Sequence, residues 1–88
     1  MIANAAVRIY DNRQNKEIII PCHRHCDAYW ILKQFGYRRN IDYKEIAQGF
    51  LDEVDNFYNR VEAKTHAKTC KQKIIDTDSP ELYTEDIW

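Results

Sequence analysis

The sequence has no apolar run long enough to cross a membrane. Short runs such as Ile18–Ile20 fall far below the roughly 20 apolar residues that a transmembrane helix needs. The first residues, MIANAAVRIYDN, also lack the basic and apolar regions of a secretory signal. Three cysteines without such a signal indicate reduced thiols, not a disulfide framework. We therefore expect a cytoplasmic protein without a membrane partner.

An excess of charge of one sign is missing as well. The 13 Lys and Arg residues against 14 Asp and Glu residues give a formal net charge of −1. Such a balance lacks the strong positive field of a general nucleic-acid binder. The distribution is uneven, however, because residues 74–88 contain no Lys or Arg. This segment carries five acids, Asp76, Asp78, Glu81, Glu85 and Asp86.

Neither internal repeats nor low-complexity segments are present. A chain of 88 residues has room for one hydrophobic core, so we expect residues 1–88 to form a single domain. Hydrophobic residues make up 44% and charged residues 31% of the chain, which is typical of a globular fold and not of a disordered one.

Alternating side chains predict a β-hairpin at the start of the chain. In residues 5–10, Ala5, Val7 and Ile9 fall on one side of a strand. The turn formers DNRQNK follow, and EIIIP then predicts a β-branched strand that ends at Pro21.

An amphipathic helix is expected over residues 27–35. Gly36 suits the left-handed position that ends a helix, and the polar residues 37–48 predict a connection with one helical turn from residue 42. The apolar stripe of the helix, spaced i, i+3, i+4 and i+7, consists of Ala28, Ile31, Leu32 and Phe35.

The second half of the chain predicts a short hairpin and a second helix. The hairpin joins residues 49–51 to residues 56–58 through a turn. Asn59 and Glu62 are spaced as a capping box, and the helix should continue to about residues 71–73. Its apolar stripe consists of Ala63, His66, Ala67 and Cys70.

The tail, residues 74–88, should pack on the core. Its last seven residues include four large apolar side chains, which are too many to leave in water. These are Leu82, Tyr83, Ile87 and Trp88. Other aromatic residues, for which core packing and a contact surface are alternatives, are Tyr37, Tyr43, Phe57 and Tyr58. Together these elements predict an α+β fold.

Three motifs are spaced along the chain. The first is Cys22-His23-Arg24-His25-Cys26-Asp27, which leads into the first helix. The second is Gln48-Gly49-Phe50-Leu51, followed by Phe57-Tyr58-Asn59-Arg60-Val61-Glu62-Ala63 and a helix that ends at Gln72. The third is the tail Leu82-Tyr83-Thr84-Glu85-Asp86-Ile87-Trp88. Together these motifs resemble a family of small uncharacterised proteins from phages and prophages, whose pattern would have Gly at Lys71. The resemblance implies a phage or mobile-element origin and a compact α+β fold, without an established activity.

All histidines and cysteines fall into two clusters. Cys and His are the usual zinc ligands, and His66 and Cys70 lie one helical turn apart on one face. The ligands that we would choose are these two with Cys22 and Cys26 (or His25). The sequence has no CxxC pair, and the alternative is that His66 and Cys70 belong to the buried stripe of their helix.

The start of the first helix is a second candidate site. The N-terminal N–H groups of a helix attract anions and lower the pKa of a nearby thiol. Arg24 and His25 could therefore hold a phosphate or carboxylate. If the protein is an enzyme, its catalytic residues are Arg24, His25 and Cys26, with Cys26 as the nucleophile and His25 as its base. In the alternative without chemistry, Asp27 or His25 only caps the helix.

The acidic tail is the strongest internal partner for this site. We expect Arg24 and His25 to hold Glu85 and Asp86 by charge-assisted hydrogen bonds. A basic stripe is expected on the solvent face of the second helix, where an acidic partner or nucleic acid would bind; a solvated face is the alternative. The stripe consists of Arg60, Lys64, Lys68 and Lys71.

These features favour a binding protein over an enzyme. From the resemblance and the small size, we expect protein–protein contacts with a host or phage factor in the host cytoplasm. Inhibition of a host defence system, or of a nucleic-acid-processing factor, is one such role. The alternative is a small Cys/His-dependent hydrolase, with zinc as its candidate cofactor, or a protein that binds a nucleotide or phosphate ligand.

Overall fold

The computed structural model describes residues 1–76 and 78–87. Its four strands form one antiparallel sheet in the order β2-β1-β3-β4, and three helices accompany the sheet, which confirms the α+β class. No helix in these described ranges is long and apolar enough to span a bilayer. The elements are β1 (Ile2–Asp11), β2 (Lys16–Cys22), α1 (His25–Gln34), β3 (Tyr43–Asp52), β4 (Phe57–Asn59), α2 (Arg60–Thr69) and α3 (Thr84–Ile87).

Strand β1 is one of the two central strands of the sheet, paired with β2 on one side and β3 on the other. Val7 stands opposite Ile20 of β2, and Ala5 stands opposite Phe50 of β3. Both expected hairpins are present, with β2 paired to β1 and β4 paired to β3. The sequence did not predict that β1 also pairs with β3 along its length, which joins the hairpins into one sheet.

Two strand boundaries differ from expectation. Strand β2 continues through Pro21, because β2 is an edge strand and a missing N–H on its outer side costs no ladder hydrogen bond. Residues 43–48, expected in a connection, belong to β3. The polar side chains of this segment did not suggest a strand in the sequence. In the structure, two of them have hydrogen-bond partners, because the Tyr29 hydroxyl donates to Glu45 and accepts from Gln48 Nε2 at 2.9 Å.

Helix α1 begins two residues earlier than expected and buries a different face. The expected stripe was right at Ala28 and Leu32, which are buried, and wrong at Phe35, which is 72% exposed. Gly36 ends the helix as predicted, with φ +78° and its N–H donating to Lys33 O at 3.0 Å. The face packed on the sheet consists of His25, Ala28, Tyr29 and Leu32.

Helix α2 has the predicted capping box and an earlier end. The Glu62 N–H donates to Asn59 Oδ1 at 2.8 Å, and the Asn59 N–H donates to Glu62 Oε1 at 3.0 Å. The helix ends at Thr69 because Lys71 takes a left-handed conformation with φ +56°. The N–H of Gln72 then turns back to Ala67 O at 2.9 Å.

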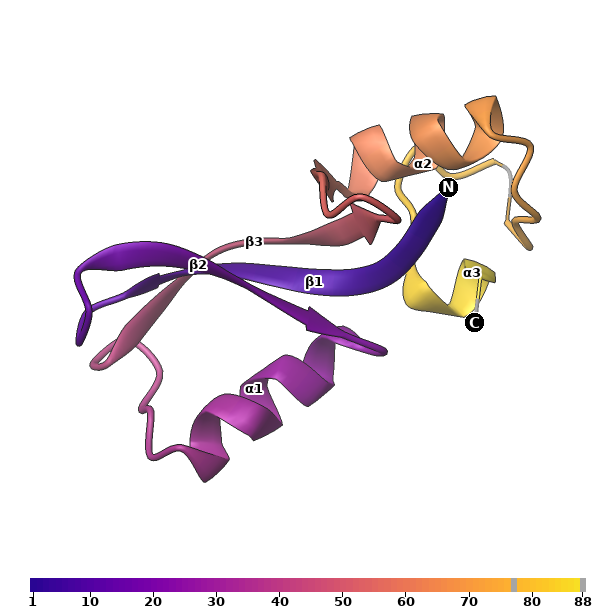
Figure 1. Ribbon diagram of the computed structural model, residues 1–88. Helices are drawn as coiled ribbons and strands as arrows, with labels where there is room; N and C mark the ends of the chain where they lie inside the picture. Colours follow the sequence, from indigo (N-terminus) through magenta and orange to yellow (C-terminus); the bar gives the residue numbers. More distant parts are fainter. Residues whose placement is uncertain (77, 88) are drawn as a thin grey trace.

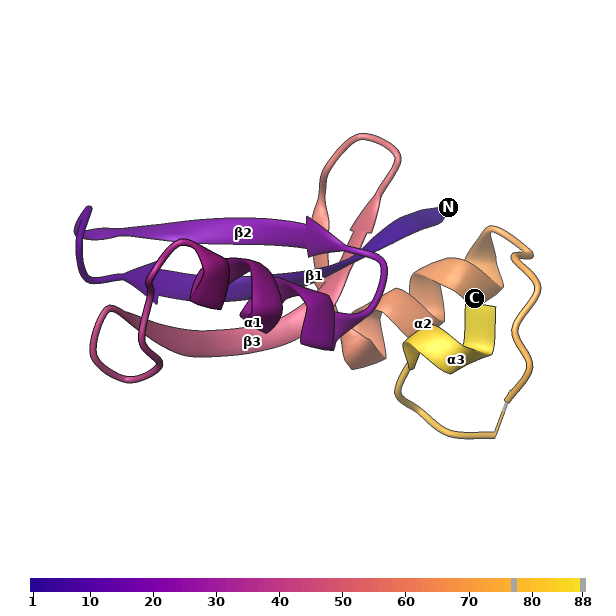
Figure 2. The same ribbon diagram turned by 90° about the horizontal axis from the view of Figure 1, so that it is seen from below.

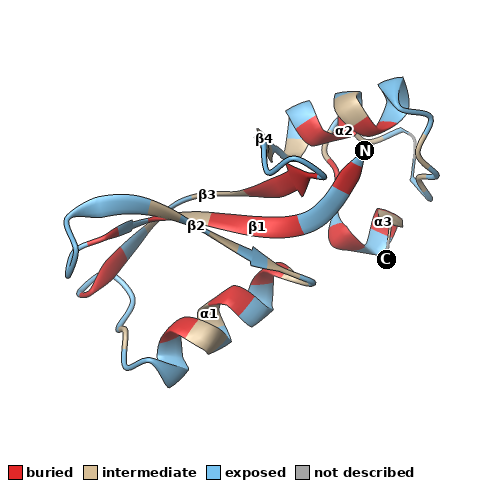
Figure 3. Ribbon diagram, in the orientation of Figure 1, coloured by how far each residue is buried: buried red, intermediate tan, exposed pale blue. Residues whose placement is uncertain are grey.

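The core consists of two clusters of buried side chains. One lies between α1 and the sheet, and the other lies where α2 and the tail meet the start of β1 (Figures 1 and 2). Buried residues follow β1 and the helix sides that face it (Figure 3). Leu82 is fully buried in the second cluster, which confirms the packing expected for this residue, whereas Tyr83 is 41% exposed. Trp88 lies outside the described residues.

The end of α2 generates the first testable prediction. A residue other than glycine is strained in the left-handed conformation by about 1 kcal/mol, so Lys71→Gly should stabilise the protein by about 0.5–1 kcal/mol. Lys73→Gly is the control, because Lys73 has no positive φ among the described residues and the change should destabilise slightly. Urea unfolding measures both variants, and a loss of stability in Lys71→Gly would contradict the assignment.

Candidate functional site

A cleft of about 530 Å³ opens between the start of α1 and the tail. The sequence predicted that Arg24, His25 and Cys26 would share a site with the tail, and the structure brings them together there. It did not predict the part played by Tyr83 and Thr84. The residues that line the cleft are Arg24, His25, Cys26, Arg60, Tyr83, Thr84 and Glu85.

Arg60 connects the walls of this cleft. Its Nη1 donates to Leu82 O at 3.1 Å, and its Nη2 donates to Gln48 Oε1 at 2.5 Å. Its guanidinium carbon lies 4.9 Å from the centre of the Tyr83 ring. The main-chain oxygen of Arg60 also accepts from the Leu82 N–H at 2.9 Å. Arg60 therefore points into the protein, so its expected place on a solvent-exposed basic stripe was wrong.

His25 forms the floor of the cleft as a neutral imidazole. Its Nε2 lies 2.8 Å from Gly49 O, and a carbonyl only accepts, so Nε2 carries the proton. Nδ1 then faces Arg60 Nη2 at 3.4 Å as an acceptor. Burial lowers the pKa of His25 below its ordinary 6.5, and the positive charge of Arg60 lowers it further. A β-carbon at Gly49 would overlap the carbonyl oxygen of Tyr58, so only glycine lets β3 and β4 pair here.

Arg24 holds the tail in part as predicted. Its Nη1 donates to Thr84 Oγ1 at 3.0 Å and lies 3.9 Å from Glu85 Oε1. Asp86 was expected beside Arg24 and His25, but it points to α2. There the Lys64 ammonium lies 3.8 Å from Asp86 Oδ2.

Lys64 is the main correction to the basic stripe. Its side chain is 2% exposed, and that of Asp86 is 8% exposed. The ammonium also donates to Asp76 O, so its charge is both paired and hydrogen-bonded. Lys68 and Lys71 are exposed, as expected. The two exposed lysines alone do not form the continuous basic face that the spacing indicated.

The cysteines of this region show no assembled catalytic pair. Both ring nitrogens of His25 are engaged by Gly49 and Arg60, which leaves His25 no free nitrogen to act as a base for Cys26. The Cys26 thiol is exposed and lies 3.9 Å from Asp27 Oδ1. Burial raises the pKa of Cys22 to about 11, so this thiol stays protonated and unreactive near neutral pH.

The expected zinc ligands do not converge. Within residues 1–76 and 78–87, no three side chains of His, Cys, Asp or Glu are grouped so that they could hold a metal ion. Cys22 packs against both core clusters. His66 stacks on Tyr58, with ring centroids 4.6 Å apart, and Cys70 Sγ lies 3.6 Å from His66 Nε2. The four residues come from different places in the fold, because Cys22 ends β2 and Cys26 lies in the first turn of α1, whereas His66 and Cys70 lie at the end of α2.

The buried Lys64–Asp86 pair predicts a coupled loss of stability. Asp86→Asn should destabilise the protein by about 3 kcal/mol, because it leaves a buried ammonium without its counter-charge. Lys64→Met leaves the Asp86 carboxylate without its counter-charge, but it should cost less, because the Tyr83 N–H still donates to that carboxylate and the unbranched Met fills the volume of the lysine stem. The double variant should be no less stable than Asp86→Asn alone in urea unfolding. Additive losses would mean that the two residues act separately.

His25 predicts a loss of stability in mild acid. Above pH 6.5 the imidazole is neutral in both the folded and the unfolded chain. As the pH falls below 6.5, the unfolded chain binds a proton that the folded protein resists, because its pKa is lowered. The melting temperature should therefore decrease in this range. In His25→Gln the melting temperature should decrease less over this pH range, whereas the control His23→Gln should show the same decrease as the wild type. Equal dependence of the melting temperature on pH in the wild type and in His25→Gln would contradict the prediction.

Comparison with known proteins identifies a family but no individual relative. No curated protein and no solved structure matches the chain. The model of the family described as phage T4 y16D protein matches residues 1–88. This match spans the whole chain, including the residues that line the cleft. The chain therefore belongs to the phage T4 y16D protein family.

Proposed function

We propose that this phage protein binds another protein through the cleft and the adjoining outer face of α1. The observation that carries the proposal is that Arg24 and Tyr83 line the cleft and that α1, which begins at the cleft, exposes Trp30. Trp30 is 64% exposed and follows Cys26, which lines the cleft, by one helical turn on the same face. Trp, Tyr and Arg are the residue types that are enriched in the hot spots of protein interfaces.

An acidic group of the partner is the chemistry that suits the cleft. The side chain of Arg24 is 35% exposed, and its distance of 3.9 Å to Glu85 is too long for a hydrogen bond. Glu85 itself is 76% exposed. A carboxylate or phosphate of the partner can therefore take the place of Glu85 beside Arg24 and form charge-assisted hydrogen bonds. The start of α1 adds the positive end of its helix dipole.

The family supports the class of partner that we propose. A phage protein meets host and phage factors in the infected cell, and a host defence or nucleic-acid-processing factor is the class of target that we infer. Enzymatic use of the cleft is less well supported, because His25 is engaged away from Cys26. The inward position of Lys64 likewise removes support for nucleic-acid binding along α2.

Quantitative capture from host lysate tests the proposal. A factor that the wild-type protein captures should bind Trp30→Ala and Arg24→Ala at least roughly tenfold more weakly, as expected for hot-spot residues. Val54→Ala is the matched control, because Val54 is 70% exposed in the β3–β4 turn, away from the cleft. Thermal unfolding of each variant checks that it folds. If Trp30→Ala and Arg24→Ala capture every factor as well as Val54→Ala does, the proposed binding surface is wrong.

A further inference from the structure

One end of the molecule is rich in basic residues, although the chain as a whole is not. The β1–β2 turn and the loop between α1 and β3 lie at this end, away from α2 and the tail (Figures 1 and 2). Residues 11–16 and 33–44 carry six basic residues against two acids, whereas the rest of the chain carries seven against twelve. The six basic residues are Arg13, Lys16, Lys33, Arg38, Arg39 and Lys44. The net charge of −1 therefore conceals a local excess of positive charge.

Two buried carboxylates tie the turn and the loop together. Asp11 accepts from the Arg13 N–H at 2.8 Å and from the Tyr37 hydroxyl at 2.9 Å. Asp42 accepts from the Arg38 N–H at 2.7 Å. The Nε atoms of Arg13 and Arg38 each donate to one oxygen of Asp42 at 3.2 Å. Both arginines are thus held side by side on one buried carboxylate.

The arginines at this end are held in place but not covered. The side chain of Arg38 is 68% exposed and that of Arg13 is 45% exposed. The guanidinium carbon of Arg13 lies 4.3 Å from the centre of the Tyr37 ring. Arg39 is paired with Glu45 at 2.9 Å, so it adds less positive charge. A guanidinium that is already held loses little freedom when it binds an anion, and its planar donors suit a phosphate.

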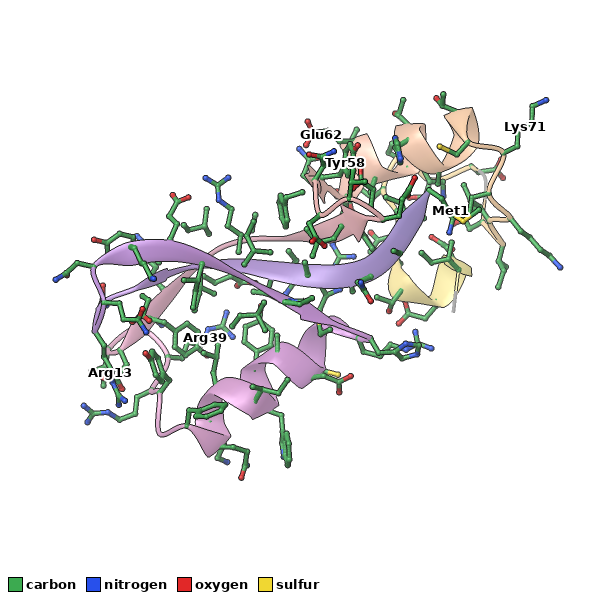
Figure 4. All side chains as sticks on the ribbon, viewed as in Figure 1. Met1, Arg13, Arg39, Tyr58, Glu62 and Lys71 are labelled. Carbon is green, nitrogen blue, oxygen red and sulfur yellow. The ribbon has the colours of Figure 1, made fainter. Side chains whose placement is uncertain are left out.

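Three lysines and one aromatic ring extend this surface. Lys16, Lys33 and Lys44 are exposed and form no ion pair within the described ranges 1–76 and 78–87. Phe35 directly follows α1 and is 72% exposed. Figure 4 shows Arg13 and Arg39 away from α2, toward the end that holds the β1–β2 turn. Basic side chains that bind phosphates, together with an exposed ring that can stack on a nucleobase, are typical of surfaces that bind single strands.

We propose that this end of the molecule binds single-stranded nucleic acid, with Arg13, Arg38 and Lys33 at the phosphates and Phe35 stacked on a nucleobase. A single strand suits the surface better than a duplex, because only unpaired nucleobases offer a free face to the Phe35 ring. An acidic segment of a protein would supply negative charge but not the alternation of phosphates and flat rings. None of these residues lines the cleft, so the inference goes beyond the proposed function and does not depend on it.

Fluorescence anisotropy of a labelled oligothymidylate tests this surface in the full chain. Binding should weaken as the salt concentration rises, because each phosphate contact releases counterions. Phe35→Ala should weaken binding roughly 5- to 100-fold through the loss of stacking. Lys33→Gln should reduce the slope of log affinity against log salt by about 0.7, which is the contribution of one phosphate contact on a single strand.

Matched variants from the segment after α2 are the controls. Lys73→Gln removes the same charge as Lys33→Gln, and Ile75→Ala removes an apolar side chain that is 76% exposed. Both should bind the oligothymidylate as the wild type does, and thermal unfolding checks that every variant folds. Absence of binding by the wild type, or equal binding by the wild type, Phe35→Ala and Lys33→Gln, would overturn the proposal. Binding of polyglutamate or of the matching duplex as tightly as the single strand would do so too, because neither offers an unpaired nucleobase.

Discussion

The guanidinium of Arg60 is the interaction on which the arrangement of the cleft depends. Arg60 stands at the first position of α2, yet its donors reach Gln48 of β3 and the main chain at Leu82. It also faces His25 of α1 and lies against the Tyr83 ring. A planar group with several fixed donors can satisfy partners in different directions at once, which a lysine ammonium on a flexible stem does less well. One side chain therefore positions a strand, a helix and the tail relative to one another.

The tail is a wall of the proposed binding site, so the stability of the tail and the shape of the site are linked. Leu82 places its side chain in the core, and Asp86 pairs with the buried Lys64. Arg24 holds the same segment from the opposite side through Thr84. Because these contacts come from α2 and from Arg24 at the N-cap of α1, loosening of the tail would open the cleft and also uncover the second core cluster. We expect a partner that engages the cleft to make the tail more rigid.

Helix α2 links the cleft to the start of β1. Arg60 at its first turn belongs to the cleft, and His66 in its last turn lies beside Met1. Its ten residues correspond to about 15 Å of helix, so one rigid element joins these two regions. Helix α2 ends early because Lys71 takes a left-handed conformation, which turns the chain so that Gln72 Oε1 accepts a hydrogen bond from the Ile2 N–H.

The sequence by itself determined the features that depend on neighbours a few residues apart. The Asn59–Glu62 capping box and the Gly36 helix end follow from such local contacts, and both were predicted correctly. Tertiary structure decided the features that depend on distant partners. The polar residues 43–48 form a strand because β3 pairs with β1. Lys64 is buried where Asp86 supplies a counter-charge and Asp76 O accepts a hydrogen bond from its ammonium. Charged residues are rarely buried without a partner. The spacing of the basic residues along α2 therefore indicated an exposed basic face. The contact of Met1 with His66 could not be predicted either, because only folding brings the start of β1 beside α2.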